Sequence, residues 1–178
     1  MMEQISNTEM LPLNEVNEMW DHYLDLDESL CIFAPRRFGK THNLVRKFIN
    51  TPRSVYITDS LYSSRRVRDK CRSLGSGVRD DLDYNRDIFS YNVVYKLMGV
   101  DIDRIFIDEF CIFRMGVDRM IRDLMPRCRQ LTMVSTMGSE IEYNDAMNYI
   151  KTVRLPYDWR NGTIKETKNF FEEGLFEL

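Results

Sequence analysis

The segment between Leu30 and Thr41 constrains the fold of this chain more than any other stretch. It reads Leu-Cys-Ile-Phe-Ala-Pro-Arg-Arg-Phe-Gly-Lys-Thr, which predicts a short apolar strand, a loop and a helix that starts near Thr41. In this order, backbone N–H groups of the loop and of the helix N-terminus point at phosphate groups and attract them. We therefore predict a phosphate-binding loop made of Ala34, Pro35, Arg36, Arg37, Phe38, Gly39, Lys40 and Thr41.

Two side chains at the end of this loop predict what it binds. Lys40 is placed to reach the β- and γ-phosphates of a nucleotide, and Thr41 to bind Mg²⁺ through its hydroxyl. The usual pattern begins with Gly, whereas this loop begins with Ala34, whose Cβ narrows the backbone choices without blocking the loop. The alternative interpretation is a tight turn from strand to helix that carries a solvated Lys40.

A second motif lies at the end of another apolar strand. Residues 105–107, Ile-Phe-Ile, are typical of a strand buried on both faces, and Asp108 and Glu109 follow directly. In a nucleotide hydrolase, Asp108 would hold Mg²⁺ and Glu109 would polarise the attacking water. Two solvated acids at a strand end are the alternative, which the upstream loop makes the weaker interpretation.

Residues 130–136 predict a further strand, which ends in the hydroxyl side chains of Ser135 and Thr136. At the tip of a strand beside the acidic strand, such hydroxyls can contact the γ-phosphate or its attacking water. The alternative is that a residue of this stretch caps the next helix. Both interpretations can hold for different residues.

The composition is that of a globular intracellular protein. A chain of 178 residues, with 43% hydrophobic and 30% charged residues, is most simply one domain with its own core. A net charge of −3 gives no whole-molecule attraction to nucleic acid. The four cysteines are widely spaced and only two histidines accompany them, which argues against a zinc site or a disulfide framework. No stretch is typical of a leader or a membrane span, so we expect a soluble protein.

Strand and helix patterns alternate along the chain. This order predicts an α/β fold, a mostly parallel sheet with helices on both faces and the ligand at the carboxyl ends of the strands. We divide the chain into a flexible lead-in over residues 1–12, one domain over residues 13–157, and a tail over residues 158–178 with an apolar and acidic end.

One predicted helix, over residues 60–74, is rich in basic side chains. Its Arg and Lys residues are Arg65, Arg66, Arg68, Lys70 and Arg72. A solvated helix face is the simpler interpretation of such a run, and a surface that follows a phosphate backbone is the alternative.

The loop 34–41, the pair Asp108-Glu109 with Phe110 after it, and Ser135-Thr136 together resemble the helicase-like and terminase-like group of P-loop ATPases. Within that group the chain looks most like the ATPase domain of large terminase subunits, the viral motors that package DNA. That family often carries Arg inside the loop and a residue other than Gly at its first position, as this chain does. The resemblance covers roughly residues 29–139.

The resemblance implies a P-loop NTPase fold and ATP hydrolysis that depends on Mg²⁺ and is coupled to DNA translocation or packaging. It implies catalytic roles for Lys40, Glu109 and either Arg36 or Arg37, whose guanidinium would stabilise charge on the γ-phosphate. It also implies nucleic acid as a partner, assembly with further copies or with a partner subunit, and, for a viral protein, the cytoplasm or nucleus of the host.

Two other classes of protein remain alternatives. A small P-loop kinase, similar in length to type II thymidine kinases, would transfer the phosphoryl group to a nucleoside or nucleotide, but this chain lacks their paired zinc cysteines. A nucleotide-binding interaction module without turnover is the second alternative. The presence of Lys40, Thr41, Asp108 and Glu109 argues against lost chemistry.

Overall fold

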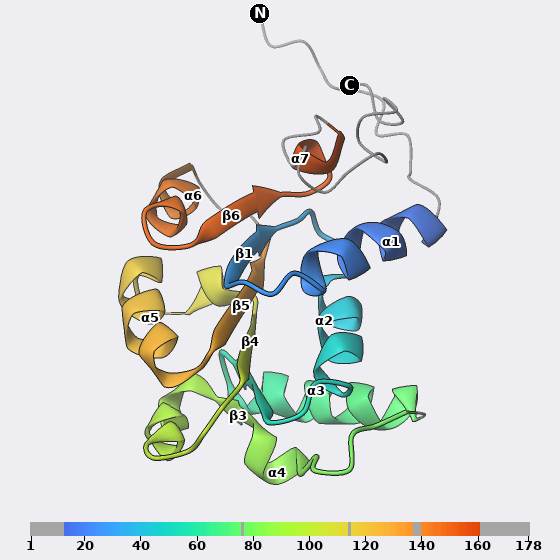
Figure 1. Ribbon diagram of the computed structural model, residues 1–178, viewed down its shortest axis with the longest axis vertical. Coiled ribbons are helices and arrows are strands. Elements are labelled where there is room, and N and C mark those ends of the chain that lie inside the picture. Colours follow the sequence, from blue (N-terminus) through green and yellow to red (C-terminus); the bar gives the residue numbers. More distant parts are fainter. Residues whose placement is uncertain (1–12, 76, 114, 137–139, 161–178) are drawn as a thin grey trace, which may run out of the picture.

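The computed structural model describes residues 13–75, 77–113, 115–136 and 140–160 (Figure 1). The α-helices are α1 (Leu13–Leu24), α2 (Lys40–Phe48), α3 (Leu61–Leu74), α4 (Tyr84–Asp87), α5 (Val117–Leu124), α6 (Glu140–Met147) and α7 (Tyr157–Arg160). The strands are β1 (Leu30–Phe33), β2 (Ser54–Thr58), β3 (Ile88–Ser90), β4 (Arg104–Asp108), β5 (Gln130–Ser135) and β6 (Lys151–Arg154). Short 3-10 helices are η1 (Tyr91–Leu97), η2 (Phe110–Ile112) and η3 (Met125–Arg127).

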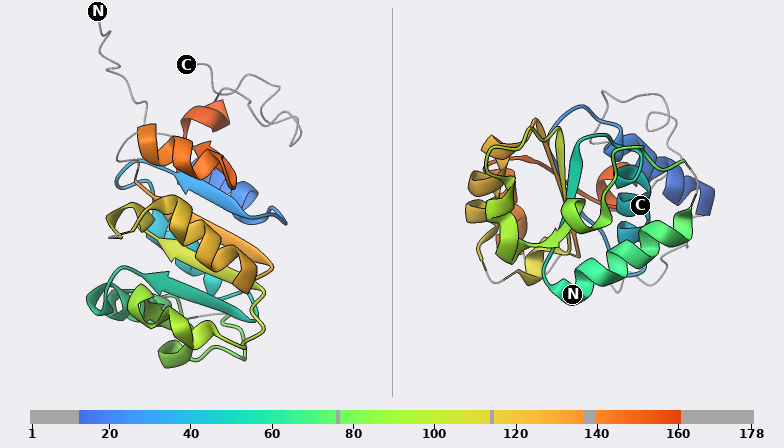
Figure 2. Two further views of the ribbon diagram at one scale, coloured as in Figure 1. Left: turned by 90° about the vertical axis from the view of Figure 1, so that its left-hand side faces the viewer. Right: turned by 90° about the horizontal axis from the view of Figure 1, so that it is seen from below.

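The six strands form one sheet in the order β3-β2-β4-β5-β1-β6, and every pairing in it is parallel. Figure 2 shows the strands stacked beside one another with helices on either side. The strand that carries the predicted acids, β4, is not next to β1. Instead β5 lies between them, with Phe33 opposite Ser135 and Asp108 opposite Val134. The carboxyl ends of β1, β5 and β4 therefore meet at one edge of the sheet.

Alternate side chains of each strand pack into two separate cores, one on each face of the sheet. On one face, Ile32, Phe106 and Val134 pack with residues of α1, α2 and α3. On the other face, Phe33 and Ile107 pack with residues of η1, α5 and α6. Figure 1 shows these two layers of helices on opposite sides of the strands. The period of two in the strands and the near-complete burial on both faces explain why these segments are apolar throughout.

The predicted fold class is confirmed at this level: the protein has an α/β fold with an all-parallel sheet flanked by helices, compatible with a P-loop-like fold. The sequence of residues 88–99 predicts a short strand and a helix that ends at Gly99; the structure forms strand β3 and then the 3-10 helix η1, with non-helical backbone angles at Val93. The predicted lead-in, residues 1–12, and residues 161–178 of the predicted tail lie outside the described residues. Helix α7 spans the predicted boundary between residues 157 and 158.

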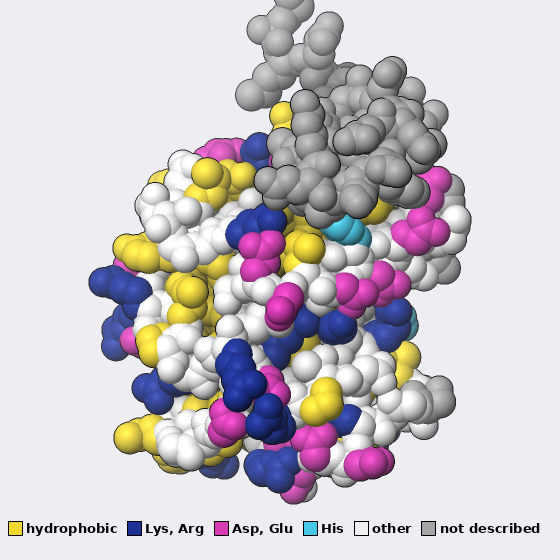
Figure 3. Space-filling view, in the orientation of Figure 1, with side chains coloured by type: hydrophobic (Ala, Val, Ile, Leu, Met, Phe, Trp, Pro, Cys, Tyr) yellow, Lys and Arg dark blue, Asp and Glu magenta, His cyan; other side chains and the backbone are white. Residues whose placement is uncertain are grey.

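Opposite charges are mixed on the surface. In Figure 3, Lys and Arg side chains lie next to Asp and Glu side chains across the face shown. Ion pairs such as Arg122 with Asp118, at 2.8 Å, and Lys151 with Glu28, at 2.6 Å, are examples of this mixing. In the described parts of the chain, no helix is both long and apolar enough to cross a membrane.

Candidate active site

A hollow of about 680 Å³ opens at the carboxyl edge of the sheet, where the loop after β1 faces the ends of β4 and β5. Its lining residues are Arg36, Arg37, Gly39, Lys40, Thr41, His42, Glu109, Cys111, Ile112, Ser135, Thr136 and Glu142. Most of the side chains singled out from the sequence therefore lie around one space. Of the remaining predicted residues, Ala34 is buried, Pro35 is exposed, Phe38 packs against the core, and Asp108 lines an adjoining hollow.

The backbone of the loop after β1 is held in shape from three sides. The Ala34 N–H donates to the Ser135 carbonyl at 3.0 Å, and the indole N–H of buried Trp20 on α1 donates to the Phe38 carbonyl at 2.8 Å. The Asn43 amide Nδ2 donates to the Gly39 carbonyl at 3.0 Å. The loop can therefore present its N–H groups without first becoming ordered, which is what tight anion binding requires.

Gly39 is the position in this loop where a side chain fits least well. Its φ of +76° lies in the left-handed region, and a Cβ built there would come 2.9 Å from Asn43 Nδ2. Glycine is the residue that adopts this conformation without strain and without that contact. The glycine at this position is thus explained by the local backbone and by the start of α2.

Lys40 lies over the loop that precedes it. Its side chain is buried, and Nζ donates to the Pro35 carbonyl at 2.8 Å. The same Nζ lies 3.6 Å from Glu109 Oε1, so the cation sits between the loop and the acidic strand. An ammonium fixed in this way can contact a phosphate bound in the loop.

The hydroxyl of Thr41 meets the carboxylate of Asp108. Thr41 Oγ1 donates to Asp108 Oδ2 at 2.6 Å, and the hydroxyl of Tyr56 on β2 donates to the same oxygen at 3.0 Å. Asp108 is buried, and Oδ1 has no hydrogen-bond partner among the described residues. Burial raises the pKa of Asp108, while the hydrogen bonds from Thr41 and Tyr56 act in the opposite direction.

This arrangement fits a Mg²⁺ ion. A buried carboxylate oxygen without a partner is costly unless a cation or a donor satisfies it. No group of three His, Cys, Asp or Glu side chains converges in the part of the chain that the structure describes. Mg²⁺ needs no such group, because it usually takes one or two protein oxygens and fills its other positions with water and phosphate oxygens. Thr41 Oγ1 and Asp108 are suitable protein donors.

Glu109 occupies a strained backbone position at the start of η2. Its φ is +51°, in the left-handed region that residues other than glycine rarely adopt. Its carboxylate faces the end of β5, where the Ser135 hydroxyl and the Thr136 N–H each lie 3.4 Å from Oε2. Strain of this kind persists where the surrounding structure holds a residue in place, and here it aims an acid into the hollow.

Three further side chains with basic groups line the rim of the hollow. Arg36 and Arg37 are exposed and line the hollow from the loop, and Arg37 has a φ of +61°. His42 lines it from the first turn of α2, and its pKa is lowered by burial and by the neighbouring charges of Lys70 and Arg46. The hollow thus combines cations from the loop with the carboxylates of Glu109, which follows β4, and of Glu142 on α6.

Sequence reasoning missed the residues that support this site from other elements. The sequence predicts a strand over residues 54–59, which contains Tyr56, and an amphipathic helix over residues 13–26, in which Trp20 either belongs to the core or presents its ring to an adenine base. Tyr56 lies opposite Phe106 in the sheet, so its hydroxyl reaches Asp108 two residues further along β4. The only sign in the sequence was a tyrosine inside an otherwise apolar strand. That its hydroxyl donates to Asp108 follows only from the order of the strands in the sheet.

Comparison with known proteins adds no relatives: no protein-family model matches the chain, and no curated protein matches its sequence.

Proposed function

We propose that this protein is an Mg²⁺-dependent ATPase with a P-loop NTPase fold. The observation that carries the proposal is the contact between Thr41 Oγ1 and Asp108 Oδ2, at 2.6 Å across 67 residues of sequence, next to a hollow that Lys40 and Glu109 also line. A phosphate-binding loop, a metal-binding hydroxyl, a buried acid and a second acid are the parts that phosphoryl-transfer sites share.

Binding of the nucleotide falls to the loop and the first turn of α2. The N–H groups of residues 36–41 and the dipole of α2 favour a negatively charged ligand. Lys40 moves its hydrogen bond from the Pro35 carbonyl to phosphate oxygens. Thr41 and Asp108 hold Mg²⁺, which when bound neutralises charge on the phosphate oxygens.

Hydrolysis falls to Glu109. Its carboxylate orients a water molecule against the γ-phosphorus and accepts the proton as the new P–O bond forms and the bond to the ADP oxygen breaks. Ser135 and Thr136, which contact Glu109 in the structure, keep its carboxylate oriented so that the water faces the γ-phosphorus. The guanidinium of Arg36 or Arg37 stabilises charge that develops on the γ-phosphate.

We further propose nucleic acid as the partner on which the energy of hydrolysis is used. The test is steady-state ATP hydrolysis in the presence of Mg²⁺, with and without double-stranded DNA, for the wild type and for Glu109→Gln. Turnover that rises with DNA and disappears in the variant supports both parts of the proposal. Turnover that DNA does not change supports the ATPase alone, and equal turnover in the two proteins contradicts the role of Glu109.

A further inference from the structure

A second, smaller hollow of about 330 Å³ adjoins the first. The two share Thr41, His42 and Glu109, so they meet at the proposed reaction centre. The other wall of the second hollow is the start of α3, which contributes Ser63, Arg66 and Lys70. Asp108 also lines this hollow, so the Mg²⁺ that Thr41 and Asp108 would hold borders it. A ligand bound against α3 would lie beside the nucleotide and close to Glu109, and the proposed ATPase mechanism places no group against α3.

The structure separates the basic residues of α3 into two groups. Arg68 donates to the Tyr84 and Ile88 carbonyls, at 2.9 and 2.6 Å, and Arg72 pairs with Asp69 at 3.0 Å. Arg68 therefore links α3 to the segment that leads into β3, and the charge of Arg72 is paired on the surface of the same helix. The side chains of Arg66 and Lys70, like that of Arg65, make no hydrogen bond or ion pair with any residue that the structure describes. Of these three, Arg66 and Lys70 line the hollow.

The positive charges of Arg66 and Lys70 lie close enough to reinforce each other. They lie four residues apart, on the same side of one helix, and the buried Val67 between them fixes that side against the core. Like charges at this spacing destabilise a helix unless an anion lies between them.

We infer that this second hollow binds a phosphate group of a second ligand, held by Arg66 and Lys70 next to the nucleotide. The inference rests on the proposed function, because it places that phosphate against the acid that is proposed to act on ATP. A helix-borne Arg and Lys without acidic partners among the described residues, facing a hollow with a hydroxyl from Ser63, form a site that suits phosphate oxygens.

Two sources can supply such a phosphate: a phosphodiester of a nucleic-acid strand, or the phosphate monoester of a small acceptor. Next to the hollow, Tyr62 is 69% exposed, and the Arg66 guanidinium lies 6.0 Å from the centre of its ring. An exposed aromatic ring beside cations is a stacking platform for a base, which both a strand and a nucleoside monophosphate carry.

The test uses the full chain with Mg²⁺ and a non-hydrolysable ATP analogue. In one arm, fluorescence anisotropy measures binding of a labelled 20-nucleotide oligothymidylate. In the other, calorimetry measures binding of AMP and of dTMP. The variant is Arg66→Ala/Lys70→Ala. The matched control is Arg65→Ala, which removes a positive charge from the same helix at a residue that does not line the hollow.

We expect the double variant to weaken binding at least tenfold in one arm, because each substitution removes a charge-assisted hydrogen bond to the phosphate. Arg65→Ala should stay within threefold of the wild type. If the oligonucleotide is the ligand, the magnitude of the slope of log K against log salt should fall by about 0.7, the value for the one phosphate group of a single strand that the double variant no longer neutralises. If the monophosphates are the ligands, the double variant should weaken the binding of AMP and dTMP and leave oligonucleotide binding unchanged.

The inference is overturned if the wild type binds neither probe, or if Arg65→Ala weakens binding as much as the double variant. Binding of a fluorescent ATP analogue, measured without the second probe, distinguishes failure of the proposed ATPase function from failure of the proposed second phosphate site. A wild type that does not bind this analogue contradicts the proposed function, whereas normal ATP binding without a second ligand contradicts only this inference. Thermal unfolding followed by circular dichroism checks that each variant is folded.

Discussion

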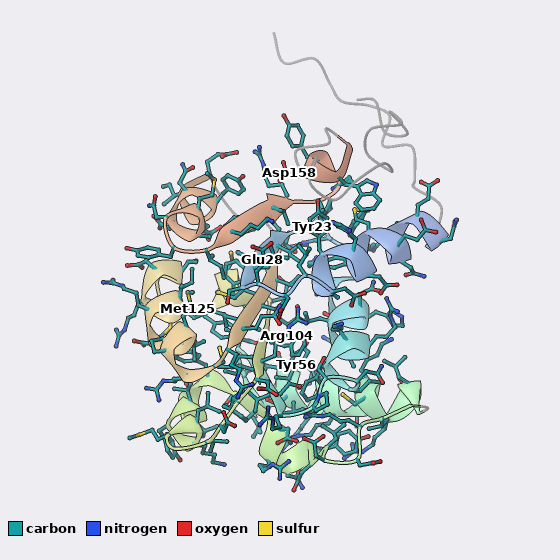
Figure 4. All side chains as sticks on the ribbon, viewed as in Figure 1. Tyr23, Glu28, Tyr56, Arg104, Met125 and Asp158 are labelled. Atoms are coloured by element: carbon teal, nitrogen blue, oxygen red, sulfur yellow. The ribbon has the colours of Figure 1, made fainter. Side chains whose placement is uncertain are left out.

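Tyr56 links the interior of the sheet to the proposed metal site. Figure 4 labels this residue, which is fully buried and packs its ring against Phe48 at a centroid distance of 5.4 Å. Its hydroxyl and that of Thr41 donate to the same oxygen of Asp108. The Asp108 carboxylate is therefore oriented by two donors, which leaves Oδ1 for another partner.

We predict that Tyr56→Phe raises by about tenfold the Mg²⁺ concentration that gives half of the Mg²⁺-dependent nucleotide binding. Metal affinity typically falls by this factor when a residue that orients a metal ligand is removed. Nucleotide binding without Mg²⁺ should stay unchanged, and the free energy of unfolding should fall by about 1 kcal/mol. A Mg²⁺ titration of the fluorescence of a bound ATP analogue measures the effect. The control is Tyr91→Phe, which removes a tyrosine hydroxyl bonded to Asp123 at 3.3 Å instead of Asp108. An unchanged Mg²⁺ dependence in Tyr56→Phe would contradict the orienting role.

Cys111 lines the first hollow, and burial there changes the pKa of its thiol. Burial raises the pKa of its thiol to about 12, so little of the reactive thiolate is present at neutral pH. We predict that the rate of alkylation by iodoacetamide rises about tenfold per pH unit between pH 7 and pH 10 without reaching a plateau. In the urea-unfolded chain the rate should level off near pH 9, because the thiol pKa returns to about 8.5. Mass spectrometry of the alkylated peptide measures both rates, and a plateau near pH 8 in the folded protein would be the contrary result.

At the scale of elements, the junction between β1 and α2 determines the shape of the site. Two glycines allow a matched test, because Gly39 and Gly99 have nearly the same φ, +76° and +75°. A Cβ at Gly39 would contact Asn43 Nδ2 at 2.9 Å, whereas a Cβ at Gly99 would meet no atom within 4 Å. An alanine would strain the backbone at both positions, and the two positions differ in what surrounds that alanine.

We predict that Gly99→Ala lowers the free energy of unfolding by about 1 kcal/mol, the cost of the left-handed backbone alone, and leaves ATP binding unchanged. Gly39→Ala should be destabilising by roughly a further 1 kcal/mol and should weaken ATP binding at least tenfold, because the Asn43 amide must move away from the loop. Urea unfolding and binding of a fluorescent ATP analogue measure the two effects. Equal effects of the two substitutions on ATP binding would contradict the proposed role of the loop.

The elements themselves were largely predictable from local sequence. Strand β4 follows from its apolar run, helix α2 from the spacing of Leu44, Val45 and Phe48, and the loop between β1 and α2 from its Gly, Lys and Thr. The contacts of the site were less predictable, because they depend on strand order. That β5 lies between β1 and β4, and so brings Ser135 and Thr136 to Glu109, is a property of the sheet and not of any one segment.

At the scale of the whole molecule, the buried charge of Asp108 in the proposed metal site lowers the stability of the protein without ligand. Because burial raises the pKa of Asp108, ionised Asp108 lowers the stability of the folded state as pH rises above its unfolded value of 3.8. The same buried charge becomes favourable when a cation is bound beside it. Ligand binding should therefore be visible in the stability of the entire domain.

We predict that Mg-ATP at about 100 times its Kd stabilises the wild type by about 2.7 kcal/mol, which raises the Tm by about 5–10 °C for a chain of this length. Asp108→Asn, which removes the buried charge, should have the same Tm as the unliganded wild type or a higher one, and should show little shift with Mg-ATP. Differential scanning fluorimetry with ATP, Mg²⁺ or both gives these values. A full Mg-ATP shift in Asp108→Asn would contradict the assignment of Asp108 to the metal.

The measurement that tests the central claim most directly is single-turnover hydrolysis of ATP, with protein in excess over nucleotide and Mg²⁺ present, for the wild type and Glu109→Gln. Excess protein isolates the chemical step from product release. We predict that both proteins bind ATP with affinities within threefold of each other, and that the variant converts it to ADP about 10²–10⁴ times more slowly. Conversion at the same rate in both proteins would contradict the claim that Glu109 activates the attacking water.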